Sequence, residues 1–270
     1  YSCAKELGDV LAGINLCFNI GISGVSGQVT TRNMSLSGTP ARTLTYQLYQ
    51  DAGHSKIWGS QYQSGATFPM VKLNLLNLTP VTGTLTVYAK LNTPQTTAVP
   101  GNYQDSYTTA TALVTLNPGL VLPPTTCGDT VAARLPFTVS ANVTKQCAIG
   151  YANNITFNPS KATDRNVTAS SALGVACTNN TPYTIGLQPS NGNTSGYGVL
   201  KGTGDNQDKV PYQLSSTPGP TGTIWGNTSL NAVAGTGTGL TTDYPVYATV
   251  PSSNFTPDNY ADTVTISVTY

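Results

Sequence analysis

The sequence has few charged side chains. Only 9% of the 270 residues are Asp, Glu, Lys or Arg, whereas ordinary globular proteins contain about 25%. The 12 basic and 11 acidic residues nearly cancel, so the chain lacks the basic surplus from which nucleic-acid binding draws its affinity. We therefore expect no nucleic-acid partner, and a surface made mostly of Thr, Ser, Asn, Gln and Gly.

Long hydrophobic runs are also missing. No stretch approaches the roughly 18 consecutive apolar residues that a membrane-spanning helix requires. The chain does not open with a charged and then apolar leader, so we expect any signal peptide to have been removed already. An apolar content of 39% and 15 tyrosines still provide enough surface to bury a core.

Groups that serve catalysis or metal binding are scarce. His54 is the only histidine, and no G-x-S-x-G elbow accompanies it. The acidic segment 205–208 lacks the twelve-residue ligand pattern of a calcium loop. The five cysteines contain no C-x-x-C pair, which argues against zinc. We expect no enzyme activity, no cofactor and no metal site.

Alternation of apolar and polar residues is the dominant pattern. It runs through 42–49, 84–91 and 263–270, and clusters of Gly, Pro and Asn separate such runs. Period-2 segments rich in Val, Ile, Thr and Tyr are typical of half-buried strands, and these separators are typical of turns. The sequence therefore predicts an all-β sandwich fold.

Four blocks occur twice in the same order, which indicates a duplicated domain. The pairs are Tyr46-Gln47-Leu48 with Tyr212-Gln213-Leu214, Ile57-Trp58-Gly59 with Ile224-Trp225-Gly226, Val87-Tyr88-Ala89 with Val246-Tyr247-Ala248, and 101–105 with 258–262. A Pro-rich stretch lies between the copies and reads as a stiff linker. We predict a first domain at 1–116, a linker at 117–126 and a second domain at 127–270.

The cysteines suit an oxidising compartment, where disulfides persist. Phe137, Val139, Ala141 and Val143 alternate and predict the opening strand of the second domain, which a Cys147–Cys177 bond would attach to the next strand. Aligning Cys3 with Cys147 and Cys17 with Cys177 predicts an equivalent Cys3–Cys17 bond. This pairing leaves Cys127 without a partner.

Several blocks of the second half resemble the spore coat U family, which includes the subunits of archaic chaperone–usher pili. They are 175–178, 181–185, Tyr212-Gln213-Leu214, Trp225-Gly226, 235–239, Val246-Tyr247 and 260–270. The resemblance covers 137–270 closely and 1–116 more loosely. The block from Tyr46 to Asp51 that the family carries survives only in the first half.

The resemblance implies two immunoglobulin-like β-sandwich domains in tandem, the second lacking its last strand. A periplasmic chaperone would fill the open groove first, and the donor strand of an adjacent pilus subunit would replace it at the outer-membrane usher. The implied localisation is the periplasm during assembly and then the cell exterior at the pilus tip. The expected donor-strand edge comprises Phe137, Val139, Val264, Ile266, Val268 and Tyr270.

The expected surface-binding residues lie on three loops. If the last strand of the first domain, at 107–116, runs toward the linker, the loops at 92–102, 51–70 and 4–12 share the far pole. Their apolar residues are Val10, Leu11, Phe68, Pro69, Met70, Ala98, Val99 and Pro100. Exposed together they would form a hydrophobic binding patch; the alternative is that they close the core.

We therefore predict a pilus tip adhesin that mediates attachment to hydrophobic abiotic or host surfaces and biofilm formation. The alternative is a glycan-binding tip lectin of the same architecture, with Trp58, Tyr62 and His54 in one loop. Because Trp58 matches Trp225 in the repeat, we expect a core or edge role for it instead.

Overall fold

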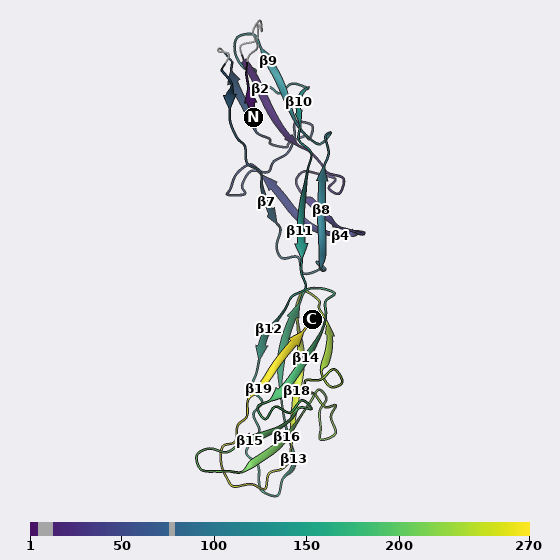
Figure 1. The fold of residues 1–270 in the computed structure, drawn as a ribbon, viewed down its shortest axis with the longest axis vertical. Coiled ribbons are helices and arrows are strands. Elements are labelled where there is room, and N and C mark those ends of the chain that lie inside the picture. The colour runs from purple at the N-terminus through teal and green to yellow at the C-terminus, as the bar shows by residue number, and fades with distance from the viewer. Residues whose placement is uncertain (5–12, 76–78) are drawn as a thin grey trace. The chain divides into compact units, whose positions relative to one another are not determined.

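The computed structural model describes residues 1–4, 13–75 and 79–270, and these residues form β-strands and no helix (Figure 1). They make two compact units. Unit 1 comprises Tyr1–Gln95 and Gly101–Val143, and unit 2 comprises Thr96–Pro100 and Thr144–Tyr270. The predicted all-β class and the two-domain organisation are confirmed.

Unit 1 is built from two main antiparallel sheets and a short two-stranded one. One sheet has the order β10-β9-β2-β5, the other β11-β8-β3-β4-β7, and β1 pairs with β6. The strands are β1 (Ser2–Cys3), β2 (Gly13–Ile20), β3 (Arg32–Leu36), β4 (Thr39–Tyr49), β5 (Met70–Asn74), β6 (Val81–Thr82), β7 (Tyr88–Leu91), β8 (Gly101–Tyr107), β9 (Ala112–Gly119), β10 (Thr130–Arg134) and β11 (Phe137–Val143).

Unit 2 is a sandwich of a five-stranded and a three-stranded antiparallel sheet. Their orders are β12-β13-β18-β16-β15 and β17-β14-β19. The strands are β12 (Cys147–Ala152), β13 (Arg165–Cys177), β14 (Pro182–Pro189), β15 (Tyr197–Lys201), β16 (Lys209–Ser215), β17 (Val233–Thr236), β18 (Thr241–Ser252) and β19 (Val264–Thr269).

The duplicated sequence blocks occupy equivalent places in the two units. In unit 1 the buried Trp58 donates its indole hydrogen bond to the carbonyl of Phe18 on β2 (2.9 Å). In unit 2 the buried Trp225 donates in the same way to Ile185 on β14 (2.8 Å). Of the core and edge roles predicted for Trp58, the core role is confirmed, and β14 is the counterpart of β2.

The repeated tyrosine and aspartate also meet in both cores. The Tyr46 hydroxyl donates to Asp105 (2.6 Å), and the Tyr212 hydroxyl donates to Asp262 (2.7 Å). Burial and then these hydrogen bonds raise the pKa of both tyrosines. The matched aspartates therefore serve as acceptors for buried hydroxyl groups, which would otherwise lie unsatisfied in the core.

Unit 1 additionally buries a guanidinium group that unit 2 lacks. Arg32 on β3 donates to the Tyr107 hydroxyl (2.7 Å) and to the backbone carbonyls of Gly21 (2.7 Å) and Trp58 (2.8 Å). It thereby links both sheets, because Tyr107 belongs to β8 and Gly21 follows β2. The counterpart of Arg32 in unit 2 is Gly198, since each pairs with the repeated tyrosine across the strand.

The boundary between the units differs from the prediction. The chain does not leave the first domain at 117–126; it turns there and returns along β10 and β11, which pair with β9 and β8. Phe137 stacks on Tyr107 at 4.6 Å between ring centroids. Residues 127–143, expected in the second domain, therefore belong to unit 1. Phe137 and Val139 lie in unit 1 as well, and not at the edge of unit 2.

One predicted disulfide is confirmed and the other is wrong. Cys147 bonds to Cys177 across the β12–β13 ladder. Cys17, however, bonds to Cys127, and Cys3 is the free thiol. The prediction failed because the returning segment places Cys127 beside β2, whereas Cys3 lies on β1, which pairs with β6.

Candidate functional site

The last strand of unit 2 has an uncovered edge. In the described part of the chain, β19 pairs with β14 on one side and with no strand on the other. None of its residues is buried: Val264, Ile266 and Val268 are half-buried against the core, and the following Tyr270 is exposed. These four residues are the predicted edge residues of the C-terminal strand.

The counterpart of β19 in unit 1 is β9, and its second edge is covered. Strand β9 pairs with β2 as β19 pairs with β14, but β10 covers its second edge. Residues 112–115 of β9 are all buried as a result. The side chains of Phe137, Val139, Ala141 and Val143 continue this cover along β8, turned inward at alternate positions. In the stretches that the structure describes, unit 2 has no counterpart of this β10–β11 cover.

Polar contacts fix the segment that leads into β19. Asp258 accepts hydrogen bonds from the backbone of Thr203 (2.7 Å) and from the side-chain amide of Asn206 (2.8 Å). Hydrogen bonds from the Thr203 hydroxyl and Asn206 lower the pKa of Asp258 to about 2. Together with the Tyr212–Asp262 bond, these contacts hold the segment that leads into the open edge in place.

The predicted patch of three loops is not formed as expected. Val10 and Leu11 lie outside the described residues. Phe68 and Pro69 are half-buried, and Met70, 51% exposed, begins edge strand β5 opposite Cys17. In the third loop Ala98 and Pro100 are half-buried and Val99 is only 6% exposed.

The physical reason is the direction in which the chain leaves unit 1. Val143 pairs with Gly101, so the exit lies at the same end as the loop 92–100. We had placed that loop at the opposite pole, on the assumption that the chain left directly after β9. The end of unit 1 that is remote from the exit is the one where Gly119 pairs with Gly13.

A strongly exposed hydrophobic loop stands at this remote end. Leu120, Val121 and Leu122 are 68%, 74% and 71% exposed. They form the tip of the turn that links β9 to β10. The sequence predicts a linker here and not a binding loop, although three consecutive large apolar residues between Gly119 and Pro123 signal an exposed hydrophobic turn.

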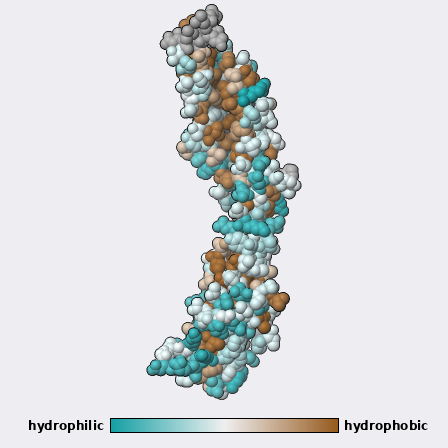
Figure 2. Space-filling view, viewed as in Figure 1, coloured by the Kyte–Doolittle hydropathy of each residue, from teal (hydrophilic) through white to brown (hydrophobic). Residues whose placement is uncertain are grey.

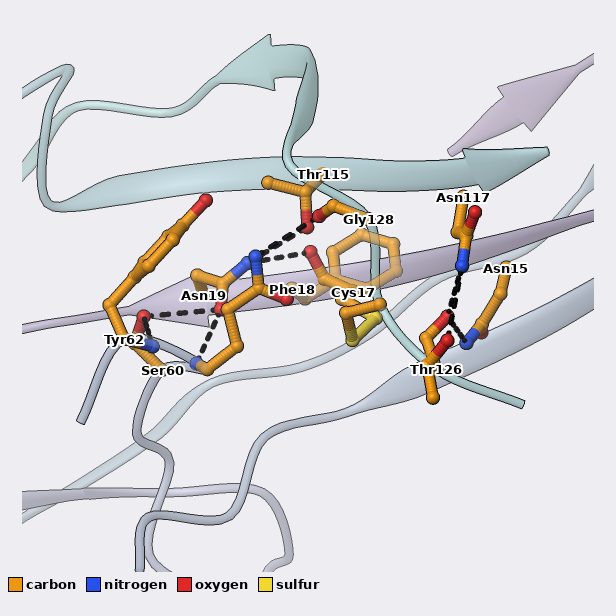
Figure 3. The surroundings of a disulfide bond; sticks show 12 residues. Asn15, Cys17, Phe18, Asn19, Ser60, Tyr62, Thr115, Asn117, Thr126 and Gly128 are labelled. Carbon is orange, nitrogen blue, oxygen red and sulfur yellow. Dashed lines mark hydrogen bonds between the residues drawn. A yellow bond between two sulfur atoms is a disulfide. The ribbon is translucent and has the colours of Figure 1, made fainter. Parts of the chain in front are cut away.

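The base of this loop is held by a disulfide and by amide side chains (Figure 3). Cys127 is bonded to Cys17 on β2. The side-chain amides of Asn15 and Asn117 both donate to the carbonyl of Thr126 (3.1 and 3.0 Å), and the two residues flank it in the figure. The apolar tip is therefore presented on a fixed base.

Close backbone packing fixes the tip itself. Strand β2 passes directly beneath the loop at Gly13, where a Cβ atom would lie 2.4 Å from the Pro123 nitrogen. A Cβ on Gly128 would lie 2.3 Å from the carbonyl oxygen of Leu116. Side chains larger than hydrogen would push the loop away from the sheet at both positions.

The only histidine of the sequence lies in a surface turn that Asp51 closes. Asp51 accepts hydrogen bonds from the backbone N–H groups of Ser55 (3.1 Å) and Lys56 (2.8 Å), which closes a surface turn. His54 has a φ of 55° in that turn and its ring contacts Tyr49. Among the described residues there is no group of three potential metal ligands, and no helix long and apolar enough to cross a membrane.

The sequence matches the model of the Spore Coat Protein U domain family twice, over residues 12–110 and 133–267. These two matches cover most of the chain. The protein belongs to the Spore Coat Protein U domain family. The second match begins within β10, so residues 133–143 align with the second family copy while they pair with strands of unit 1.

Two solved structures match this family member at low sequence identity, and the first of them shares its fold. One is the chaperone–tip adhesion subunit pre-assembly complex CsuC–CsuE from archaic chaperone-usher Csu pili of Acinetobacter baumannii. The match has 16% identity and a TM-score of 0.56, and it covers 100% of this chain and 89% of that one. A chaperone–tip adhesin complex of CFA/I fimbriae matches at 13% identity and a TM-score of 0.37 over 99% of this chain and 82% of that one. A comparison with curated proteins found no match.

Proposed function

We propose that this protein is the tip adhesin of a chaperone–usher pilus. In this proposal unit 2 joins the fibre through a donated strand, and unit 1 contacts the surface to which the cell attaches. The observation that carries the proposal is the uncovered edge of β19. In unit 1 the equivalent edge, that of β9, is covered by β10.

A strand donated by another chain is the natural occupant of that edge. Unpaired backbone groups and half-buried apolar side chains on β19 are a template for strand addition, and left uncovered they promote aggregation. A periplasmic chaperone would cover the edge during assembly, and the adjacent pilus subunit would cover it after transfer at the outer-membrane usher. The protein would then act first in the periplasm and finally at the cell exterior.

Strands β10 and β11 provide a ready test of this anchoring role. A synthetic peptide with the sequence of residues 130–143 is added to the intact protein, and thermal unfolding of each unit is followed separately. Trp58 and Trp225 are the only tryptophans, so replacing either by Phe leaves a fluorescence signal from one unit. The peptide is expected to raise the midpoint of unit 2, because a ligand that binds only the folded state stabilises it.

The matched control is the same peptide with Ser at the positions of Phe137, Val139 and Val143, which removes the inward apolar side chains. It should leave unit 2 unchanged. Equal stabilisation by both peptides, or by neither, would contradict strand donation.

The surface contact is assigned to Leu120, Val121 and Leu122. Burial of each side chain on an apolar surface contributes about 1.5–3 kcal/mol at most, and a rigid base reduces the entropy lost on binding. Such contacts need no specific shape on the other side. Attachment to hydrophobic abiotic or host surfaces, and biofilm formation, would follow.

The test compares retention of the intact protein on phenyl-coated beads. Replacing all three residues by Ser is expected to abolish retention. The control variant carries the same replacement at Leu230 and Leu240 of unit 2, which are 96% and 60% exposed. The beads should retain this variant. Similar retention of both variants would contradict the assignment, and retention that a free sugar competes away would favour the lectin alternative.

A further inference from the structure

Unit 1 has an uncovered edge of its own, on the opposite sheet. Leu48 pairs with Ala89 in unit 1 as Leu214 pairs with Ala248 in unit 2, so β7 is the counterpart of β18. On one side β18 pairs with β13 along its length, from Ala176↔Thr241 to Arg165↔Ser252. Within the described residues, β7 pairs with β4 and with no strand on its other side.

The last residues of the missing strand are nevertheless present. Counting back from Ala89 and Ala248 makes Thr82 the counterpart of Thr241. Ser2 pairs with Thr82 as Ala176 pairs with Thr241, so Ser2 and Cys3 occupy the positions of Ala176 and Cys177. The ladder continues to Tyr1, whose amino group donates to the Gly83 carbonyl (2.7 Å) and whose carbonyl accepts from the Gly83 N–H (3.0 Å).

Beyond the pairs that β1 and Tyr1 make, side chains at and before β7 are exposed to solvent, whereas their counterparts on β18 are buried. Val87 is 40% exposed, whereas its counterpart Val246 is 5% exposed. Ala89 is exposed and Ala248 is buried. A largely apolar groove of about 260 Å³ opens at this place, with Tyr1, Phe18, Leu85, Val87 and Phe137 among its lining residues. In the view of Figure 2, hydrophobic residues gather over the visible face of unit 1.

The free thiol lies at the position that carries a disulfide in unit 2. Cys177 is bonded to Cys147, which stands opposite it on β12. Cys3 takes the place of Cys177, and it is half-buried. Burial raises the pKa of the Cys3 thiol, which argues against a reactive thiolate. A structural disulfide is the role that this position has in the other unit.

We propose that the edge from Thr84 to Leu91 is the docking site for a two-stranded segment joined to the amino side of Tyr1. Its second strand runs into Tyr1 in the register of β13 and covers Leu85 and Val87. Its first strand corresponds to β12 and carries a cysteine that bonds to Cys3. We choose a segment of the same polypeptide because β1 already forms the last two pairs of the expected ladder, Ser2 with Thr82 and Cys3 with Val81. A strand that continues this ladder therefore runs directly into Tyr1. This inference does not depend on the pilus role.

The chain itself supplies the segment for a test. A copy of residues 146–175 replaces Tyr1, which joins the copied Val175 directly to Ser2 in the observed register. Cys3 is expected to become protected from alkylation in the unreduced, denatured protein, and peptide mapping should find it bonded to the copied Cys147. Amide hydrogen exchange at 84–91 should slow by roughly tenfold or more.

The matched control carries Asn at the copied Val167 and Leu173. It should leave Cys3 open to alkylation and the exchange unchanged. The tryptophan signal of unit 2 reports whether each variant folds. If the fusion interferes with folding, the same copy is offered to the intact chain as a separate peptide, and protection of 84–91 is measured.

Two results would overturn the proposal. One is an intact graft, or peptide, that leaves Cys3 alkylated and the exchange at 84–91 fast. The other is protection of this edge in the ungrafted chain through a Cys3–Cys3 dimer, which would make a second copy the occupant.

Discussion

Units 1 and 2 share registers, buried tryptophans and Tyr–Asp pairs, yet each is open on a different sheet. In unit 1, β10 and β11 cover β9 and β8, while β7 has a neighbour on one side only among the residues that the structure describes. In unit 2, β13 covers β18, while β19 is bare. An immunoglobulin-like sandwich can thus leave one edge strand to another segment while the rest of its core stays buried. The edge that is open determines where a partner strand can add.

The largest expected loss of stability in either unit comes from removing its disulfide. Cys17–Cys127 spans 110 residues and Cys147–Cys177 spans 30. Chain entropy assigns about 4–5 kcal/mol to the longer loop and about 3–4 kcal/mol to the shorter one. Replacing Cys17 and Cys127 by Ser should destabilise unit 1 more than the matched double replacement destabilises unit 2. Denaturant titration with single-tryptophan variants measures both, and equal losses would contradict the expectation.

The next largest expected effect comes from removing the buried guanidinium group of Arg32, which is present in unit 1 alone. Arg32→Met leaves the carbonyls of Gly21 and Trp58 and the Tyr107 hydroxyl without their donor. Leaving one such buried group unsatisfied costs about 1–3 kcal/mol, and several groups lose their donor at once. The loss should appear in the unfolding free energy of unit 1 alone, since Gly198 holds the equivalent position in unit 2. An unchanged midpoint for unit 1 would mean that water replaces the lost donor groups.

Two equivalent valines, Val246 in unit 2 and Val87 in unit 1, should differ in how much they contribute to stability. Val246→Ala should cost about 2 kcal/mol in unit 2, because a buried methyl pair is lost. Val87→Ala should cost less than about 0.5 kcal/mol in unit 1, because Val87 is partly exposed. Chemical denaturation of the two variants checks this. A large loss at Val87 would indicate that the edge is already covered in solution.

The smallest expected difference between the units is in how their stability depends on acidic pH. The pKa of Asp258 in the folded state is about 2, below the value of about 3.9 for an unfolded Asp. Its stabilising contribution is therefore complete above about pH 4 and is lost as the pH falls toward 2. Asp258→Asn should flatten this part of the pH dependence for unit 2 and leave unit 1 unaffected. A thermal midpoint measured at intervals of pH tests it, and an unflattened profile would assign the effect to other carboxylates.

Local patterns predicted the elements but not always their partners. Alternation identified the strand at 42–49 and, of the run 84–91, only the half that forms β7, and the repeated blocks placed Trp58 in a core. The same alternation made Phe137–Val143 a strand, but period 2 does not encode which sheet a strand joins. That single ambiguity moved the domain boundary, reversed the pole assigned to the loop 92–102 and paired Cys17 with the wrong cysteine.

The exposed loop escaped prediction for a related reason. A Pro-rich stretch between two domains reads as a connection, and only the return of the chain along β10 turns it into the tip of unit 1. Its tether, Cys127, was visible in the sequence but had no assigned partner. The C-terminal edge was easier to predict, because Val264, Ile266 and Val268 form a plain alternating run at the end of a duplicated block.

The segment that connects the units is itself part of a sheet, which has a mechanical consequence. Tension applied beyond Val143 would act first on the ladder between β11 and β8 and then on β10. Val143 follows Cys127 by 16 positions, so complete peeling would release about 55 Å of chain. The load would then pass through the Cys17–Cys127 bond into β2. Leu120, Val121 and Leu122 lie on the far side of that bond, so they would keep their position while the connecting strand lengthens.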